Sequence, residues 1–288
     1  MIRHAQTPEV CSACRQGRAV FVLLLALVVG GVLLAAHIMG SPIFPAAEGR
    51  AAVQTARFDH EHAAWTDLLG RYVRDGVVDY AGLNQDGQPA LNAYLEDLET
   101  AAGHQSAWPR EQRLAYWINA YNAYTVRLIL DNYPLKSIRS IGLLPGAAFR
   151  RRFIPLGIGG AELTLDDIEH RTLRPEFEDA RIHFDIVCAS ISCPPLQSQA
   201  FRASDIDAEL DAAARQFLTD ETRNRLETDS ATLFLSSIFD WFREDFERDA
   251  GSLEAFVSRF LSESDAAAFR IGSFRIRFLD YDWSLNGR

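Results

Sequence analysis

Apolar residues recur at helical spacing through most of the chain after position 57, and short β-branched or aromatic runs lie between these stretches. The first pattern is typical of amphipathic helices and the second of strands. The predicted helices are Phe58–Val73, Pro89–Glu99, Arg110–Asn132, Leu165–Leu173, Asp205–Leu218, Ser236–Phe246 and Leu253–Leu261. The predicted strands are Phe153–Leu156 and Ala161–Leu163, paired as a hairpin, followed by Ile182–Val187, Leu233–Leu235 and Phe274–Leu279.

The segment Arg110–Asn132 has the strongest helical pattern, and it ends before Pro134, where proline excludes helical geometry from the preceding residue. We expect this helix at the centre of the fold. The strands are scattered among helices without a regular alternation, which predicts an α+β protein: a single helix-rich domain with a small mixed or antiparallel sheet. Trp117, Trp241 and Phe242 are expected in its core.

An uncharged apolar run, Ala19–Ala36, precedes the domain. As a helix it would extend roughly 27 Å, close to the thickness of the bilayer hydrocarbon. Arginines on its N-terminal side place that side in the cytoplasm. We therefore expect a cytoplasmic tail (1–18), a transmembrane signal anchor (19–39), a tether (40–56) and a globular domain (57–288) in the periplasm, held at the inner membrane by a single pass. Cleavage of the run as a signal peptide is the alternative.

The chain has a formal net charge of −10 and no basic stripe, which argues against nucleic acid or anionic lipid as the main partner. The expected contact with a membrane is therefore through the N-terminal helix alone. No pattern in the sequence indicates a cofactor.

Four cysteines divide between the two sides of the apolar run. Cys11 and Cys14 form a CxxC in the polar tail without a second CxxC, so this pair supports no zinc module. Cys188 and Cys193 follow the run, and an oxidising compartment favours a disulfide between them. Two free thiols are the alternative.

Four motifs carry a resemblance to a known family. They are YWINAYNAY (Tyr116–Tyr124), DDIEH (Asp166–His170), HFDIVCASISCPP (His183–Pro195) and YDWSLN (Tyr281–Asn286). Together they resemble the domain-of-unknown-function 547 family (DUF547), from about Trp65 to Asn286. The resemblance implies a common fold but no settled reaction, and its members are often secreted or membrane-tethered. It also implies a set of recurring positions: Asn119, Asn122, Glu169, His170, His183, Cys188, Ser190, Cys193, Asp282 and Trp283.

These positions favour a binding or structural module, in which a Cys188–Cys193 disulfide stiffens a loop. Asn119 and Asn122, one helical turn apart, would then bond the backbone of that loop as a buried polar clamp. Ser190 and Asp282 belong to the same polar cluster, and Asp282 would pin the C-terminus.

The alternative is a thiol enzyme for acyl transfer or amide hydrolysis, with Cys188 as nucleophile. His170 is the better base, oriented by Glu169 or Asp282. If 182–187 is a strand, His183 and Cys188 point to opposite faces. A zinc ion on His170, His183, Cys188 and Cys193 is a third hypothesis, but their spacing matches no standard zinc module, so no metal site is predicted.

Overall fold

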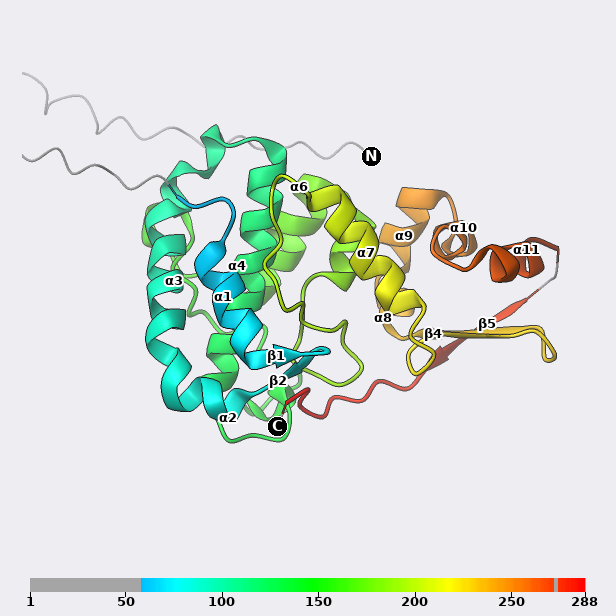
Figure 1. Ribbon diagram of the computed structural model, residues 1–288, viewed down its shortest axis with the longest axis horizontal. Coiled ribbons are helices and arrows are strands. Elements are labelled where there is room, and N and C mark those ends of the chain that lie inside the picture. The colour runs from blue at the N-terminus through cyan, green and yellow to red at the C-terminus, as the bar shows by residue number, and fades with distance from the viewer. Residues whose placement is uncertain (1–57, 272–273, 288) are drawn as a thin grey trace, which may run out of the picture. The chain divides into compact units, whose positions relative to one another are not determined.

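The computed structural model of the protein describes residues 58–271 and 274–287. Figure 1 shows how the helices and strands of this part are arranged. The helices are α1 (Ala63–Tyr72), α2 (Tyr80–Gly82), α3 (Gln88–Ala101), α4 (Arg110–Leu130), α5 (Leu165–Ile168), α6 (Arg174–Phe177), α7 (Ile206–Leu218), α8 (Ile238–Trp241), α9 (Arg243–Ala250), α10 (Leu253–Ser258) and α11 (Glu263–Ile271). The strands are β1 (Val73–Arg74), β2 (Val77–Val78), β3 (Arg225–Glu227), β4 (Thr232–Ser236) and β5 (Arg275–Leu279).

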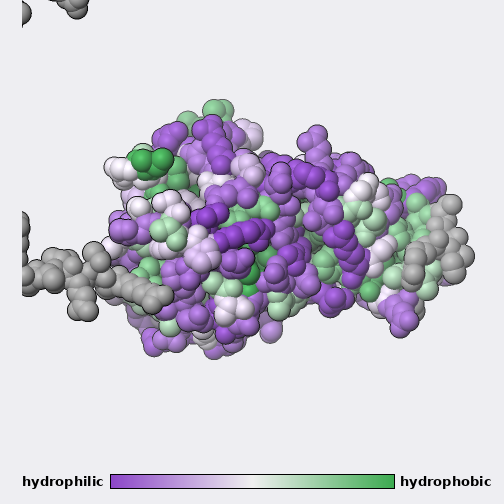
Figure 2. Space-filling view, turned by 90° about the horizontal axis from the view of Figure 1, so that it is seen from above, coloured by the Kyte–Doolittle hydropathy of each residue, from purple (hydrophilic) through white to green (hydrophobic). Residues whose placement is uncertain are grey.

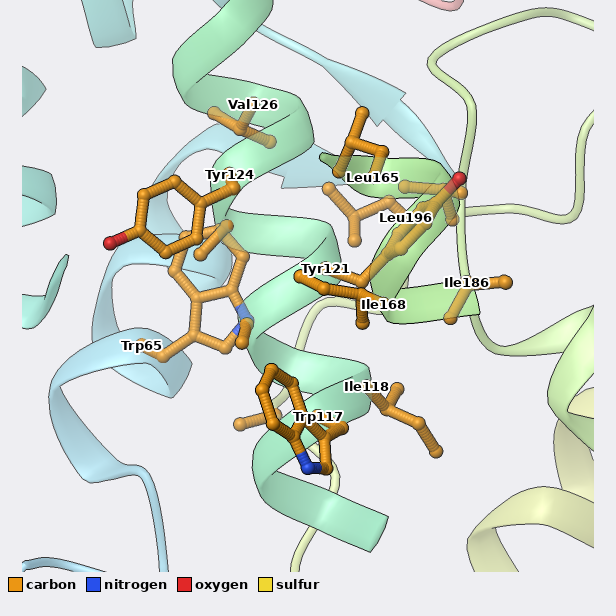
Figure 3. Close-up of a cluster of buried hydrophobic side chains, with 14 of the residues drawn as sticks. Trp65, Trp117, Ile118, Tyr121, Tyr124, Val126, Leu165, Ile168, Ile186 and Leu196 are labelled. Atoms are coloured by element: carbon orange, nitrogen blue, oxygen red, sulfur yellow. The ribbon is translucent and has the colours of Figure 1, made fainter. Parts of the chain in front are cut away.

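Helix α4 organises the larger of two hydrophobic clusters. Almost all of its residues from Leu114 to Leu130 are buried, including those on the side away from its apolar stripe. Helices α3 and α5 pack against it, and Figure 3 shows Trp65 of α1 and Leu165 and Ile168 of α5 beside it. A helix that is buried on every side lies at the centre of a domain, as the sequence predicted for this segment.

A small mixed sheet accompanies the helices. Strand β4 lies in the middle, antiparallel to β3 and parallel to β5, so that Leu233 pairs with Leu226 on one side and with Ile276 on the other. Strands β1 and β2 form a separate two-stranded ribbon. The predicted α+β class, rich in helix with a small mixed sheet, is confirmed. The expected hairpin between Phe153 and Leu163 is reduced to one bridge, Ile154 with Leu163.

A second hydrophobic cluster is built largely from phenylalanine rings. Phe184, Phe217, Phe239, Phe246 and Phe256 pack with ring centroids 4.8 to 6.4 Å apart. They come from α7, α8, α9, α10 and the segment before the cysteine loop. Outside the two clusters, the face shown in Figure 2 is mostly hydrophilic, in keeping with an acidic domain.

The segment predicted as a strand, Ile182–Val187, does not form one. Ala180–Phe184 is a 3-10 helix instead, and the Asp179 side chain caps it by accepting a hydrogen bond from the Arg181 N–H. Ile182 and Ile186 pack into the α4 cluster while Phe184 packs into the phenylalanine cluster. Because the segment is buried on two sides, its apolar pattern resembles that of a strand. The prediction that His183 and Cys188 point to opposite faces of a strand was therefore wrong.

Two further predicted helices are divided. Ser236–Phe246 is broken at Phe242 into α8 and α9, and Leu165–Leu173 is α5 continued by a π-helical turn, Glu169–Leu173. The Thr164 hydroxyl accepts from the Asp167 N–H and the Asp167 carboxylate accepts from the Thr164 N–H, which forms a capping box at the start of α5. π-Helical turns are often found at functional sites, and this one carries Glu169 and His170.

The expectation of a transmembrane signal anchor finds no support in the structure. Within residues 58–271 and 274–287, none of the helices is both long enough and apolar enough to cross a bilayer. The run predicted to span the membrane (19–39), the tail with Cys11 and Cys14, and the tether (40–56) lie outside the described residues. The periplasmic location stays a prediction.

Candidate functional site

A cavity of about 180 Å³ lies where the two hydrophobic clusters meet the cysteine loop. Its walls combine aromatic rings with several titratable groups. The lining contains Tyr121 from α4, Asp166 from α5, Glu169 and His170 from the π-helical turn, His183 from the 3-10 helix, Cys188, Cys193 and Pro194 from the loop, Trp241 from α8, and Tyr281 and Trp283 from the C-terminal segment, together with Phe149, Ile186, Ile238 and Phe242.

The loop that carries the cysteines is held in a tight turn. Ala189 adopts a φ of 57°, in the left-handed region that L-residues other than glycine and asparagine rarely enter. The turn lets the Cys188 N–H donate a hydrogen bond to Cys193 Sγ at 2.9 Å. Strain of this kind costs of order 1–3 kcal/mol and persists only where neighbouring contacts hold it.

The C-terminal segment supplies those contacts. The Asn286 N–H donates to the Ala189 carbonyl at 3.2 Å, and the Ile191 N–H donates to the Ser284 carbonyl at 2.9 Å. Ser192 Oγ accepts from the Asp282 N–H at 2.8 Å. The YDWSLN motif therefore holds the cysteine loop against the rest of the domain. The Asp282 carboxylate is exposed and accepts from the Ser284 N–H, so the structure places it in this turn and not beside His170.

The expected Cys188–Cys193 disulfide is absent. Both cysteines are free and are 3.1 Å apart, whereas a sulfur–sulfur bond is about 2.05 Å long. The loop is held instead by the backbone bonds described above. The prediction of a disulfide was wrong. The hypothesis that a disulfide stiffens this loop is therefore wrong as well.

The Cys188 sulfur lies between two hydroxyl groups. Ser190 Oγ is 3.0 Å from it and Tyr281 Oη is 3.1 Å from it. Burial opposes ionisation of the thiol, but hydrogen bonds from Cys193, Ser190 and Tyr281 outweigh burial and lower its pKa to about 7. Burial and the neighbouring Cys188 raise the pKa of the Cys193 thiol. Burial also raises the pKa of Tyr281, so its hydroxyl keeps the proton that it donates to sulfur.

Glu169 is a buried acid on the cavity wall. Burial raises its pKa to about 7, with Asp166 and Cys188 adding to the rise and Arg174 opposing it. Among the described residues, its carboxyl group makes one hydrogen bond, a long one of 3.3 Å from Tyr121 Oη. A carboxylic acid with a pKa near neutrality can both give and take a proton under ordinary conditions.

His183 is held by an acid that the sequence did not single out. His183 Nε2 lies 2.8 Å from Asp245 Oδ2, and its ring stacks on Phe242 with centroids 3.9 Å apart. Arg174 Nε bonds the same carboxylate at 2.6 Å. Burial lowers the pKa of His183 despite Asp245, so the imidazole is neutral, with its Nε2–H donating to Asp245. Among the described residues, His183 Nδ1 has no hydrogen-bond partner.

His170 lies at the edge of the cavity and is exposed. Arg174 Nη1 donates to His170 Nδ1 at 3.1 Å, and burial together with the Arg174 charge lowers the pKa of the imidazole. Within the described part of the chain, no hydrogen bond joins His170 or His183 to Cys188, and none joins His170 to Glu169. The cavity therefore brings Glu169, His170, His183, Cys188 and Cys193 together without a Cys–His pair.

Asn119 and Asn122 lie away from the cavity wall and bond backbone groups. Asn119 donates to the Phe201 carbonyl at 2.7 Å and accepts from the Phe201 N–H at 3.1 Å. Asn122 donates to the Asp185 carbonyl at 2.8 Å and accepts from the Val187 N–H at 2.9 Å. The second asparagine thus fixes the chain directly before Cys188.

The four side chains of the zinc hypothesis line one cavity, but they are not arranged around a common metal position. In the described ranges, no group of three or more His, Cys, Asp or Glu side chains is arranged to hold a metal ion. His183 Nε2 and His170 Nδ1 are already bonded to Asp245 and Arg174.

Several site residues were missed from the sequence. Tyr121 and Trp241 look like core residues by spacing, although Trp241 is 48% exposed and lines the cavity. Tyr281 stands in a motif that was noted for its neighbours Asp282 and Trp283. Asp245 and Arg174 carry no local signal, because their role depends on contacts with residues far along the chain.

The comparisons with known proteins agree with the motif resemblance. Residues 105–218 match the model of a family described as "Protein of unknown function, DUF547". This match confirms the family suspected from the motifs, and its range includes α4, the π-helical turn and the cysteine loop. No curated protein and no solved structure matches the chain.

Proposed function

We propose that this domain, whose residues 105–218 match the DUF547 family, is a thiol-dependent enzyme that transfers or hydrolyses acyl groups, with Cys188 as nucleophile. The observation that carries the proposal is the free Cys188 sulfur at a cavity wall, 3.0 and 3.1 Å from two hydroxyl groups that favour its thiolate form. Thiolate is the reactive form of cysteine. A structural cysteine buried in apolar surroundings would have its pKa raised, as Cys193 does.

Glu169 is the proposed proton carrier. The Cys188 thiolate attacks the acyl carbon, the bond to the leaving group breaks, and the Glu169 carboxylic acid gives the leaving group a proton. The Glu169 carboxylate then takes a proton from water or another acceptor as that acceptor attacks the thioester. Cys188 leaves as thiolate, and both groups return to their starting state.

His183 and Asp245 are positioning residues in this proposal. The buried imidazole, fixed by Asp245 and stacked on Phe242, forms one wall of the cavity. Among the described residues, His170 makes its hydrogen bond to Arg174 and none to either cysteine sulfur, so it is given no proton-transfer step.

The test uses the full chain and an activated ester, p-nitrophenyl acetate. The wild type should gain one acetyl group, located on Cys188 by peptide mass spectrometry. Cys193→Ala is the matched control and should still be acetylated on Cys188, more slowly than the wild type because it loses one of the hydrogen bonds that lower the Cys188 pKa. Cys188→Ser should not acquire the rapid thioester. Glu169→Gln should accumulate the acetylated form, because deacylation lacks its base. Equal acetylation of wild type and Cys188→Ser would refute the proposal and favour a non-catalytic binding module.

The extracytoplasmic location expected from the N-terminal sequence stays a prediction. It has its own test, since a fusion reporter placed after residue 56 that is active only in the cytosol would contradict it.

A further inference from the structure

We propose that the acceptor in this reaction is a primary amine, whose ammonium group enters the cavity beside Glu169 and His183. The inference rests on the proposed function, because it names what attacks the thioester. Three features of the cavity point to this chemistry: its aromatic walls, the sign of its charged groups and one buried nitrogen without a partner.

The walls contain a cluster of electron-rich rings. Trp241, Tyr281 and Trp283 pack with centroids 4.6 to 5.8 Å apart, and all three line the cavity. The faces of tryptophan and tyrosine attract cations. Two rings of the lining already do so, since the Arg139 guanidinium lies 5.2 Å from the Trp283 ring and that of Arg174 lies 5.2 Å from Phe242.

The charges on the walls have one sign. Asp166, Glu169 and the Cys188 thiol are the groups that can carry negative charge, and no lysine or arginine is among the described lining residues. An anionic ligand would meet like charge in a mostly apolar enclosure, which is costly. An ammonium group would meet opposite charge.

The His183 ring lines the cavity, and its Nδ1 is a buried nitrogen without a hydrogen-bond partner among the described residues. The Nε2–H bond to Asp245 leaves this nitrogen as an acceptor. A buried acceptor without a donor is costly, and an N–H group of a ligand would satisfy it. An ammonium group has three N–H donors, which suits His183 Nδ1 together with the Glu169 carboxylate.

The size of the cavity limits what enters. About 180 Å³ is below the range of roughly 300–1,000 Å³ that is typical of pockets for drug-sized ligands. A short alkylammonium group fits this limit. In the reaction the amine gives a proton to the Glu169 carboxylate, its nitrogen attacks the thioester carbon, and the carbon–sulfur bond breaks. Loss of the second proton to solvent leaves an amide, with Cys188 again a thiolate and Glu169 again protonated.

The test is binding measured without chemistry. Full-length Cys188→Ser is titrated by calorimetry at pH 8 with n-butylammonium, and separately with n-butanol and n-butanoate as neutral and anionic controls. Butylammonium should bind at least tenfold more tightly than either control, and Asp166→Asn and Glu169→Gln should each weaken it about fivefold. Glu162→Gln, on an exposed carboxylate, should leave it unchanged.

Equal binding of the three probes, or none, would overturn the inference. The acetylation of Cys188 is measured separately, so its persistence in that case would leave the proposed thiol chemistry standing. Conversely, amine binding without acetylation would refute the proposed function and leave an amine-binding module.

Discussion

Two sets of buried polar side chains flank the segment before Cys188, and they differ in how fully they are hydrogen-bonded. Asn119 and Asn122 each donate and accept at 2.7 to 3.1 Å, so both ends of each amide are satisfied by backbone. Glu169 has one bond of 3.3 Å, and His183 Nδ1 has none among the described residues. Satisfied buried groups hold a fold, whereas unsatisfied groups beside a cavity keep capacity for a ligand.

The largest effect is expected at the asparagines. Asn122→Ala should lower the free energy of unfolding by about 4 kcal/mol, because it leaves the Asp185 carbonyl and the Val187 N–H buried without a partner. Urea denaturation of the full chain measures the loss. Asn92→Ala is the control, since this exposed side chain makes one bond to Arg127 and should cost less than about 1 kcal/mol. Equal, small losses of unfolding free energy in the two variants would contradict the claim that the buried asparagines hold the fold.

Substitution of Glu169 should raise the free energy of unfolding at alkaline pH, whereas substitution of Asn122 should lower it. Its pKa is raised from 4.5 to about 7 by burial, so the stability that its protonated form provides is present at pH 4 and is lost as the pH rises through 7. Glu169→Gln should therefore match the wild type at pH 4 and exceed it by up to about 3 kcal/mol at pH 8. Denaturation at the two pH values measures this, with the exposed Glu162→Gln as control. A variant that is less stable at pH 8 would mean that the carboxylate is structurally satisfied.

A smaller effect is expected at Tyr281. Tyr281→Phe removes a hydroxyl that lies 3.1 Å from Cys188 Sγ, and one hydrogen bond to a charged group corresponds to about one pKa unit. The pKa of Cys188 should rise by about that amount, as followed by the pH dependence of its alkylation. Tyr124→Phe, whose hydroxyl bonds Glu99 instead, should leave the pKa unchanged. No difference between the two variants would show that Tyr281 does not favour the thiolate.

The sequence predicted the fold better than the site. Helix α4 was predictable because a long apolar stripe ends before Pro134. The segment Ile182–Val187 was wrongly predicted because its side chains are buried in two different clusters, which gives the apolar pattern of a strand. None of the described strands pairs with it. The disulfide was wrong because spacing cannot show how a loop is held. It is held here by the backbone of residues 282–286.

The site residues differ in how far along the sequence their contacts reach. Cys188, Glu169 and His170 stand in motifs, so a resemblance could propose them. Asp245 bonds His183 across 62 positions of the sequence, and Tyr281 reaches Cys188 across 93. Contacts of this length depend on how α9 and the C-terminal segment pack, and no local pattern in the sequence encodes that.

The most direct test of the account is the pH dependence of Cys188 alkylation by iodoacetamide, read by peptide mass spectrometry on the full chain. We expect a rate that rises with a midpoint near pH 7, below the ordinary value of about 8.5 for a cysteine, while Cys193 reacts far more slowly. A midpoint at or above the ordinary value, or a Cys188 that does not react, would contradict the claim that this thiol is activated.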